Sequence, residues 1–197
     1  MKILIAGDSF AAQWPNGEEG WPYLLAAEHE VKNVAQAGVS EYKIYKQIRN
    51  EDLSKYDCVI VSHTSPNRIH TPKHPIHNVG LHQNCDLIYT DLENHSSFFN
   101  KSLEIAKGWF KFHYDQEYQN DIYSLLRREI NNIIKIPYIS LNNLDVSKDF
   151  ACEDVNIDFS SLWVKERGSV NHYSTIGNLT VYSIIRKELD KLNKKDV

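Results

Sequence analysis

The chain has 197 residues, of which 42% are hydrophobic and 24% are charged, a composition that supports a packed core and excludes long disorder. The 22 Lys and Arg residues against 26 Asp and Glu give a formal net charge of −4, so we expect no general attraction to nucleic acid or to anionic lipid. The three cysteines, Cys58, Cys85 and Cys152, contain no CxxC pair and are predicted to be reduced thiols rather than a disulfide framework.

The N-terminal apolar run is too short for a signal peptide. Only the four residues from Ile3 to Ala6 separate Lys2 from Gly7, whereas a signal-peptide core has about 7–15 apolar residues. No other run approaches the ~20 apolar residues that span a bilayer. The sequence therefore predicts a cytoplasmic protein that does not enter a membrane.

Short apolar runs alternate with helical patterns along the chain. Strands are predicted where a brief apolar or β-branched run is bounded by polar or turn-forming residues, at Lys2–Ala6, Val31–Ala35, Cys58–Ser62 and Ile136–Leu141. Helices are predicted where apolar residues recur at helical spacing, at Trp21–Ala27, Ser40–Ile48, Ser96–His113 and Tyr118–Ile134, and from Ser174 onward. This alternation predicts an α/β fold with a parallel sheet, and because no repeat or linker divides it, a single domain over residues 1–197.

Polar loops follow the predicted strands, and in open parallel sheets ligands bind outside the carboxyl ends of the strands. These loops are Gly7-Asp8-Ser9-Phe10, Ala37-Gly38-Val39-Ser40 and Thr64-Ser65-Pro66-Asn67, joined by Asn171–Asn178 ahead of the last helix. Together they can supply a nucleophile, oxyanion donors and a base.

The order of these loops resembles the sequence blocks of the SGNH hydrolases, the GDSL-type esterase and lipase superfamily. The resemblance implies a flavodoxin-like three-layer α/β/α sandwich with a central parallel sheet. It makes Ser9 the nucleophile and His172 the base, and it makes Ser9, Gly38 and Asn67 the oxyanion hole. The third block departs from the usual Gly-x-Asn-Asp, since it reads Ser65-Pro66-Asn67-Arg68.

These roles also follow from the chemistry of the side chains. A serine hydroxyl is a poor nucleophile until a base accepts its proton, and an imidazole with a pKa of about 6.5 suits that exchange, so His172 can activate Ser9. The attacked carbonyl oxygen becomes anionic and needs preorganised donors, which the N–H groups of Ser9 and Gly38 and the Asn67 amide can supply.

The acid of a catalytic triad is missing from its expected place. The family carries Asp three residues before its His, and here that position is Ser169. Two alternatives remain: a Ser9–His172 dyad oriented by a backbone carbonyl or water, or an acid reaching in from the preceding loop, Asp154 or Asp158.

One loop is rich in histidine, at His63, His70, His74, His77 and His82. The sequence predicts no metal there, because Pro72 and Pro75 prevent a helix that would align two imidazoles and no cysteine or carboxylate pair completes a set. Instead His63, Arg68 and His70 are predicted to lie beside the substrate. Asp8 is assigned to the same substrate-binding edge, as a residue that stabilises the turn rather than one that reacts.

The expected activity is hydrolysis of a small acyl ester, in the first place an acetyl ester, on a carbohydrate or another polar molecule. The partner is thus a small-molecule or glycan ester, with no cofactor, no nucleic acid and no membrane. Two alternatives stay open: an O-acyltransferase that uses the same Ser–His site, and a catalytically inactive binding module. Ser169 and the altered third block favour the inactive module.

Overall fold

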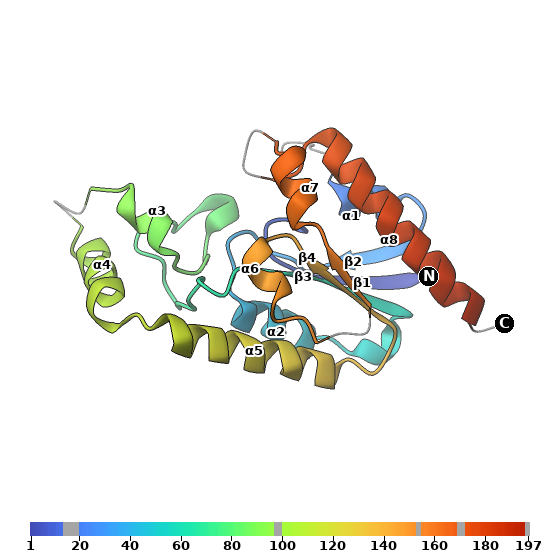
Figure 1. Cartoon of the computed structure of the whole chain (residues 1–197), viewed down its shortest axis with the longest axis horizontal. Helices are drawn as coiled ribbons and strands as arrows, with labels where there is room; N and C mark the ends of the chain where they lie inside the picture. The colour runs from blue at the N-terminus through green and yellow to red at the C-terminus, as the bar shows by residue number, and fades with distance from the viewer. Residues whose placement is uncertain (14–19, 97–99, 153–154, 169–171, 196–197) are drawn as a thin grey trace.

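A computed structural model describes residues 1–13, 20–96, 100–152, 155–168 and 172–195 (Figure 1). Within these residues a five-stranded sheet has the order β2-β1-β3-β4-β5, and every neighbouring pair is parallel. The strands are β1 (Lys2–Gly7), β2 (Glu30–Asn33), β3 (Cys58–His63), β4 (Tyr138–Asn142) and β5 (Asn156–Asp158). The predicted α/β sandwich with a central parallel sheet is confirmed.

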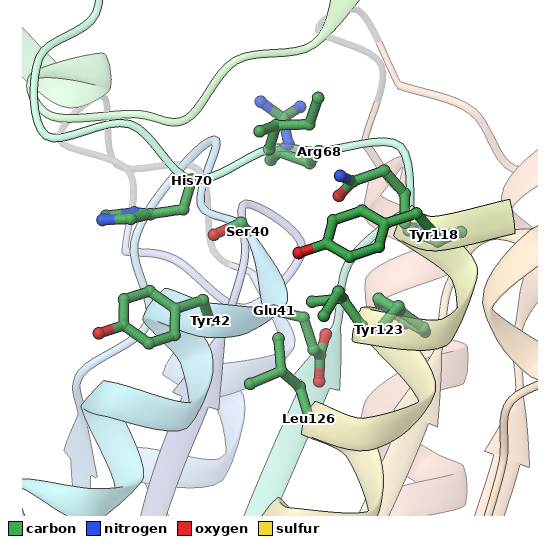
Figure 2. A pocket seen from close by; sticks show the side chains of 12 residues that line it. Ser40, Glu41, Tyr42, Arg68, His70, Tyr118, Tyr123 and Leu126 are labelled. Atoms are coloured by element: carbon green, nitrogen blue, oxygen red, sulfur yellow. The ribbon is translucent and has the colours of Figure 1, made fainter. Parts of the chain in front are cut away.

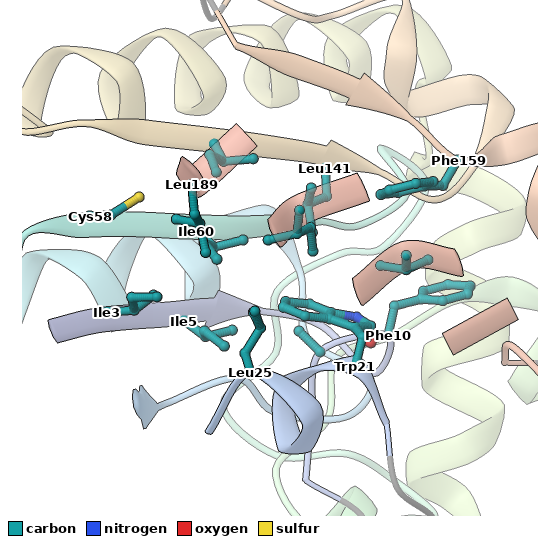
Figure 3. Close-up of a cluster of buried hydrophobic side chains, with 14 of the residues drawn as sticks. Ile3, Ile5, Phe10, Trp21, Leu25, Cys58, Ile60, Leu141, Phe159 and Leu189 are labelled. Carbon is teal, nitrogen blue, oxygen red and sulfur yellow. Dashed lines mark hydrogen bonds between the residues drawn. The ribbon is translucent and has the colours of Figure 1, made fainter. Parts of the chain in front are cut away.

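Helices cover both faces of the sheet, and this explains why the central strands are continuously apolar. One face carries α1 (Trp21–Ala26) and α8 (Thr175–Lys195), and the other carries α2 (Glu41–Arg49) and α5 (Gln116–Ile133) (Figure 1). Side chains of β1 alternate between the two cores: Ile3 and Ile5 pack with Trp21 of α1 (Figure 3), and Leu4 packs with Ile44 of α2.

A smaller lobe extends from one side of the sandwich (Figure 1). It contains α3 (Tyr89–Glu93) and α4 (Lys101–His113), which bury Leu92 against Leu103 and Phe110 in a separate apolar cluster. The remaining short helices are η1 (Leu53–Lys55), η2 (Gly80–His82), α6 (Asp145–Lys148) and α7 (Ser160–Lys165). Among the helices of the described residues, none is both long enough and apolar enough to cross a bilayer.

Several boundaries differ from the predicted ones. The second strand covers Glu30–Asn33 rather than Val31–Ala35, and beyond its end the Val34 and Gln36 N–H groups still donate to the Ile5 and Gly7 carbonyls of β1. The helix predicted from Ser96 starts at Lys101, where the Asn100 side chain accepts from the Leu103 N–H at 3.0 Å. Such an N-cap fixes a helix start more firmly than apolar spacing does.

Candidate active site

The turn that carries Ser9 leaves the carboxyl end of β1. The carbonyl of Asp8 accepts from the N–H groups of Ala11 and Ala12, which closes the turn and leaves Ser9 half-buried on it. Gly7 is required just before the turn because its φ is +152° and a Cβ there would lie 2.6 Å from the Ser62 Cβ on β3. The turn is therefore pressed directly against the neighbouring strand.

His172 comes to the same turn from the other end of the chain. Its ring packs edge-on against the ring of Phe10, with centroids 5.3 Å apart, and Phe10 directly follows Ser9. Phe10 is itself fixed, since its carbonyl accepts from the Trp21 indole N–H at 2.9 Å and its ring contacts that of Tyr173 at 5.2 Å. The structure thus brings the predicted base to the turn of the predicted nucleophile.

A buried hydrogen-bond chain lies beneath this turn. The Tyr173 hydroxyl donates to Asn143 Oδ1 at 2.7 Å, Asn143 Nδ2 donates to the Ser62 hydroxyl at 2.8 Å, and that hydroxyl donates to Asp8 Oδ1 at 3.2 Å. Asp8 also accepts from the Phe10 N–H at 3.1 Å. Burial raises the pKa of Asp8 to about 7, opposed by the Phe10 bond and by Arg68. Asp8 therefore acts as a support of the turn.

Gly38 lies in the loop after β2 in a backbone conformation that favours glycine. Its φ is +70°, and a Cβ there would lie 2.8 Å from the Cys85 Cβ. Its carbonyl accepts from the Asp86 N–H at 2.7 Å and from Arg68 Nη1 at 3.2 Å. These two hydrogen bonds hold the Gly38 carbonyl and fix the position of Gly38 at the carboxyl edge of the sheet.

Asn67 lies in the turn after β3, and its side-chain amide is oriented by two donors. Asn67 Oδ1 accepts from the Tyr114 hydroxyl at 3.1 Å and from Gln116 Nε2 at 2.8 Å. An amide whose oxygen is held in this way presents its NH₂ group on the opposite side. That orientation turns the NH₂ group of Asn67 away from Tyr114 and Gln116.

A pocket of about 320 Å³ opens between the start of α2, the loop after β3 and α5 (Figure 2). Arg68 and His70, two of the predicted substrate-binding residues, line it. The His70 ring packs on the Tyr42 ring at 4.8 Å. The Ser40 hydroxyl is buried at the pocket and has no hydrogen-bond partner among the described residues. The pocket thus combines a cation with a flat aromatic surface.

His63, the third predicted substrate-binding residue of this loop, lies elsewhere. Its side chain is fully buried at the end of β3. Its Nδ1 is 2.5 Å from Glu41 Oε1 and its Nε2 is 2.9 Å from the Tyr138 hydroxyl. Both ring nitrogens are thus engaged in the interior, and His63 joins α2 to β3 and β4 instead of facing a ligand.

The candidates for a third catalytic member are only partly described. Asp154 and Ser169 lie outside the described residues. Asp158 Oδ1 accepts from the Ser160 N–H at 2.9 Å, and Asp158 Oδ2 is 3.9 Å from Lys148 Nζ. The Asp158 carboxylate is thus engaged by the start of α7 and lies near Lys148.

Two residues that support the site were missed in the sequence. The Gln47 side chain accepts from the Gly7 N–H at 2.8 Å and donates to the Gly7 carbonyl at 3.2 Å, which fixes the end of β1 from α2. Asp86 is fully buried and accepts from the Ser40 N–H at 2.7 Å; Lys43 Nζ lies 2.9 Å away. A glutamine inside a helical pattern and an aspartate inside a loop carry no local signal of such partners.

One group of side chains has the composition of a metal site. His74, His77 and Cys85 each offer one ligand atom, and these atoms lie within 4.8 Å of one another. The sequence argument against a metal found no cysteine or carboxylate pair to complete a set, whereas the structure brings Cys85, which follows η2, to His74 and His77.

No protein-family model matches this chain, and no curated protein matches it. Among solved structures, it is similar to the crystal structure of a protein from Lactobacillus plantarum, a structural-genomics target. The two share 10% sequence identity over 96% of each chain, with a TM-score of 0.43.

Proposed function

We propose that the protein is a serine ester hydrolase that removes a small acyl group, in the first place acetyl, from a carbohydrate or another polar alcohol. The supporting observation is the ring contact between Phe10 and His172, because it sets an imidazole beside the turn that bears Ser9. Gly38 and Asn67 follow β2 and β3, whose carboxyl ends share one edge of the parallel sheet with β1.

In the proposed reaction the Ser9 hydroxyl attacks the acyl carbon while its proton passes to His172. The carbonyl oxygen becomes anionic and accepts from the N–H groups of Ser9 and Gly38 and from Asn67 Nδ2. Collapse of the tetrahedral intermediate expels the alcohol, which takes the proton from His172. Water, deprotonated by the same imidazole, then attacks the acyl-serine, and the imidazolium returns the proton to Ser9 Oγ as the acid leaves.

The pocket beside Arg68 and His70 is the proposed site of the alcohol portion. The Tyr42 ring offers a surface on which a sugar ring can lie, and Arg68 offers hydrogen bonds to hydroxyl or carboxylate oxygens. The same pocket favours a second candidate function, transfer of the acyl group to a bound sugar hydroxyl instead of water.

Covalent labelling of Ser9 tests the proposal. We expect a fluorophosphonate to label the protein at Ser9 and p-nitrophenyl acetate to be cleaved, with both signals lost in Ser9→Ala. Ser183→Ala, an exposed serine on α8, is the matched control and keeps both. Absence of labelling in folded protein would refute the hydrolase and leave the binding module. Acyl transfer would appear as an acylated sugar acceptor with little free acid.

A further inference from the structure

Two segments of one long loop meet away from the Ser9 turn. His74 and His77 come from the segment after β3, and Cys85 follows η2. His74 and Cys85 are each 1% exposed, and His77 is half-buried. With their ligand atoms within 4.8 Å of one another, three groups that can each bind a cation converge in the interior of the loop.

His74 has a nitrogen that the protein does not use. Its Nδ1 accepts from the N–H groups of Ile76 and His77, both at 3.1 Å, so the neutral ring carries its proton on Nε2. Nε2 is buried and has no hydrogen-bond partner among the described residues. Native proteins seldom leave such a group unpaired. A cation bound at Nε2 would satisfy this nitrogen, and the ring proton would then move to Nδ1, which requires the Ile76 and His77 N–H groups to turn away from that atom.

Nothing else in the described chain explains why these side chains gather. No hydrogen bond or ion pair joins His74, His77 and Cys85 to one another among the described residues. The His77 ring is instead surrounded by further imidazoles, with centroids 4.7 Å from His74, 5.4 Å from His82 and 6.4 Å from His95. Among the described residues no ion pair joins His74, His77 or Cys85 to a carboxylate, although the charges of Asp86 and Asp91 act on this group. The three side chains therefore resemble a ligand set more than a salt-bridge network.

The types of ligand atom in this group indicate which metal it would bind. Imidazole nitrogen and thiolate sulfur bind Zn²⁺ in tetrahedral sites with bonds of about 2.0–2.3 Å, whereas Mg²⁺ and Ca²⁺ prefer oxygen. In such a tetrahedron neighbouring ligand atoms lie ~3.3–3.8 Å apart, so small side-chain movements would bring this group together. Three protein ligands leave a fourth position to water or to His82.

We infer that His74, His77 and Cys85 form a zinc site that fixes the histidine-rich loop against the edge of the sheet. Cys85 packs on Gly38, and the next residue, Asp86, bonds the Gly38 carbonyl with its N–H and the Ser40 N–H with its side chain. An ion held by Cys85 would therefore stabilise the loop that carries Gly38. This role is structural and holds whether or not the protein hydrolyses esters.

Cobalt titration of the tag-free full-length protein, stripped of metal with a chelator, tests the inference. We expect one equivalent of Co²⁺ to bind with the visible spectrum of a tetrahedral site and a thiolate-to-cobalt charge-transfer band, and Zn²⁺ to displace it with a Kd of about 1 μM or tighter. The charge-transfer band is lost in Cys85→Ser, and affinity falls at least ~10-fold in His74→Ala. Cys152→Ser and His29→Ala, which change a cysteine and a histidine outside the cluster, bind as the wild type does.

A second readout needs no variant. Saturating Zn²⁺ should raise the Tm of the wild-type protein by about 5 °C or more, because the ion binds the folded state alone. Circular dichroism shows whether each variant is folded before its affinity is compared. The inference is overturned by wild-type protein that gives neither the charge-transfer band nor a Tm shift, or by a band that survives in folded Cys85→Ser.

Discussion

The Tyr173 hydroxyl donates to Asn143 Oδ1 at 2.7 Å, which ties the segment ahead of α8 to the end of β4. The adjacent His172 carbonyl accepts from the Gly168 N–H at 2.6 Å. The backbone of the proposed base is thus held on two sides, while its ring rests on Phe10. Because these contacts hold the backbone, the imidazole of His172 can be replaced without disturbing the residues that position it.

His172→Ala should therefore lower turnover of p-nitrophenyl acetate by about 10²–10⁴-fold, the usual contribution of a general base. Because the ring is only half-buried, the free energy of unfolding should change by no more than ~1 kcal/mol. Steady-state kinetics and urea unfolding measure the two quantities, with His29→Ala as the control. A fully active variant would remove His172 from the mechanism.

Asp8 should make stability fall as pH rises. Its pKa is about 7 in the folded protein against an ordinary 3.8, so between these values the folded state binds more protons than the unfolded state. Stability is then greatest below pH ~4 with respect to this group and declines up to pH ~7, by at most about 4 kcal/mol.

Asp8→Asn should remove this component, because the amide stays neutral and its oxygen can still accept from Phe10 and Ser62. Urea unfolding of both proteins between pH 4 and 8 measures it. We expect the free energy of unfolding of Asp8→Asn, relative to wild type, to increase with pH. Parallel curves for the two proteins would show that Asp8 does not titrate in this range.

Gly38→Ala should destabilise the protein. The new Cβ would lie 2.8 Å from the Cys85 Cβ at a φ of +70°, and strain of this kind costs about 1–3 kcal/mol. Gly108→Ala is the matched control, since α4 has open space at that position and alanine favours a helix by up to ~1 kcal/mol. Equal unfolding midpoints for the two variants would contradict this account of Gly38.

The sequence predicts those strands and helices whose own residues carry a clear pattern, without help from residues distant in the chain. The continuously apolar runs at β1 and β3 are sufficient to place two buried parallel strands. The strand β5 (Asn156–Asp158) was missed because it has three residues, two of them exposed, and its polar ends resemble a loop. The helix start at Ser174 was predicted, and the Ser174 hydroxyl accepts from the Gly177 N–H at 3.1 Å.

Partners that are distant in sequence could not be predicted. His63 has the residue type expected at a ligand site, yet Glu41, 22 residues earlier, holds it in the core. Cys85 was read as an isolated thiol because its approach to His74 depends on the path of the whole intervening loop. Residue type indicates which chemistry is available, and only the fold decides which groups meet.

Variants of Asn67 and of its two partners separate the orientation of the Asn67 amide from its proposed role as a hydrogen-bond donor to the oxyanion. Asn67→Ala removes the proposed oxyanion donor and should lower kcat by about 10²–10³-fold. The double variant Tyr114→Phe, Gln116→Leu keeps the donor but releases its carbonyl from both partners, so kcat should fall by about 10–10²-fold with little change in KM. Glu117→Gln, an exposed change next to Gln116, should leave both constants unaltered. If the double variant keeps the wild-type kcat while the kcat of Asn67→Ala falls, the amide does not need to be oriented by Tyr114 and Gln116. If Asn67→Ala keeps the full kcat, Asn67 is not an oxyanion donor.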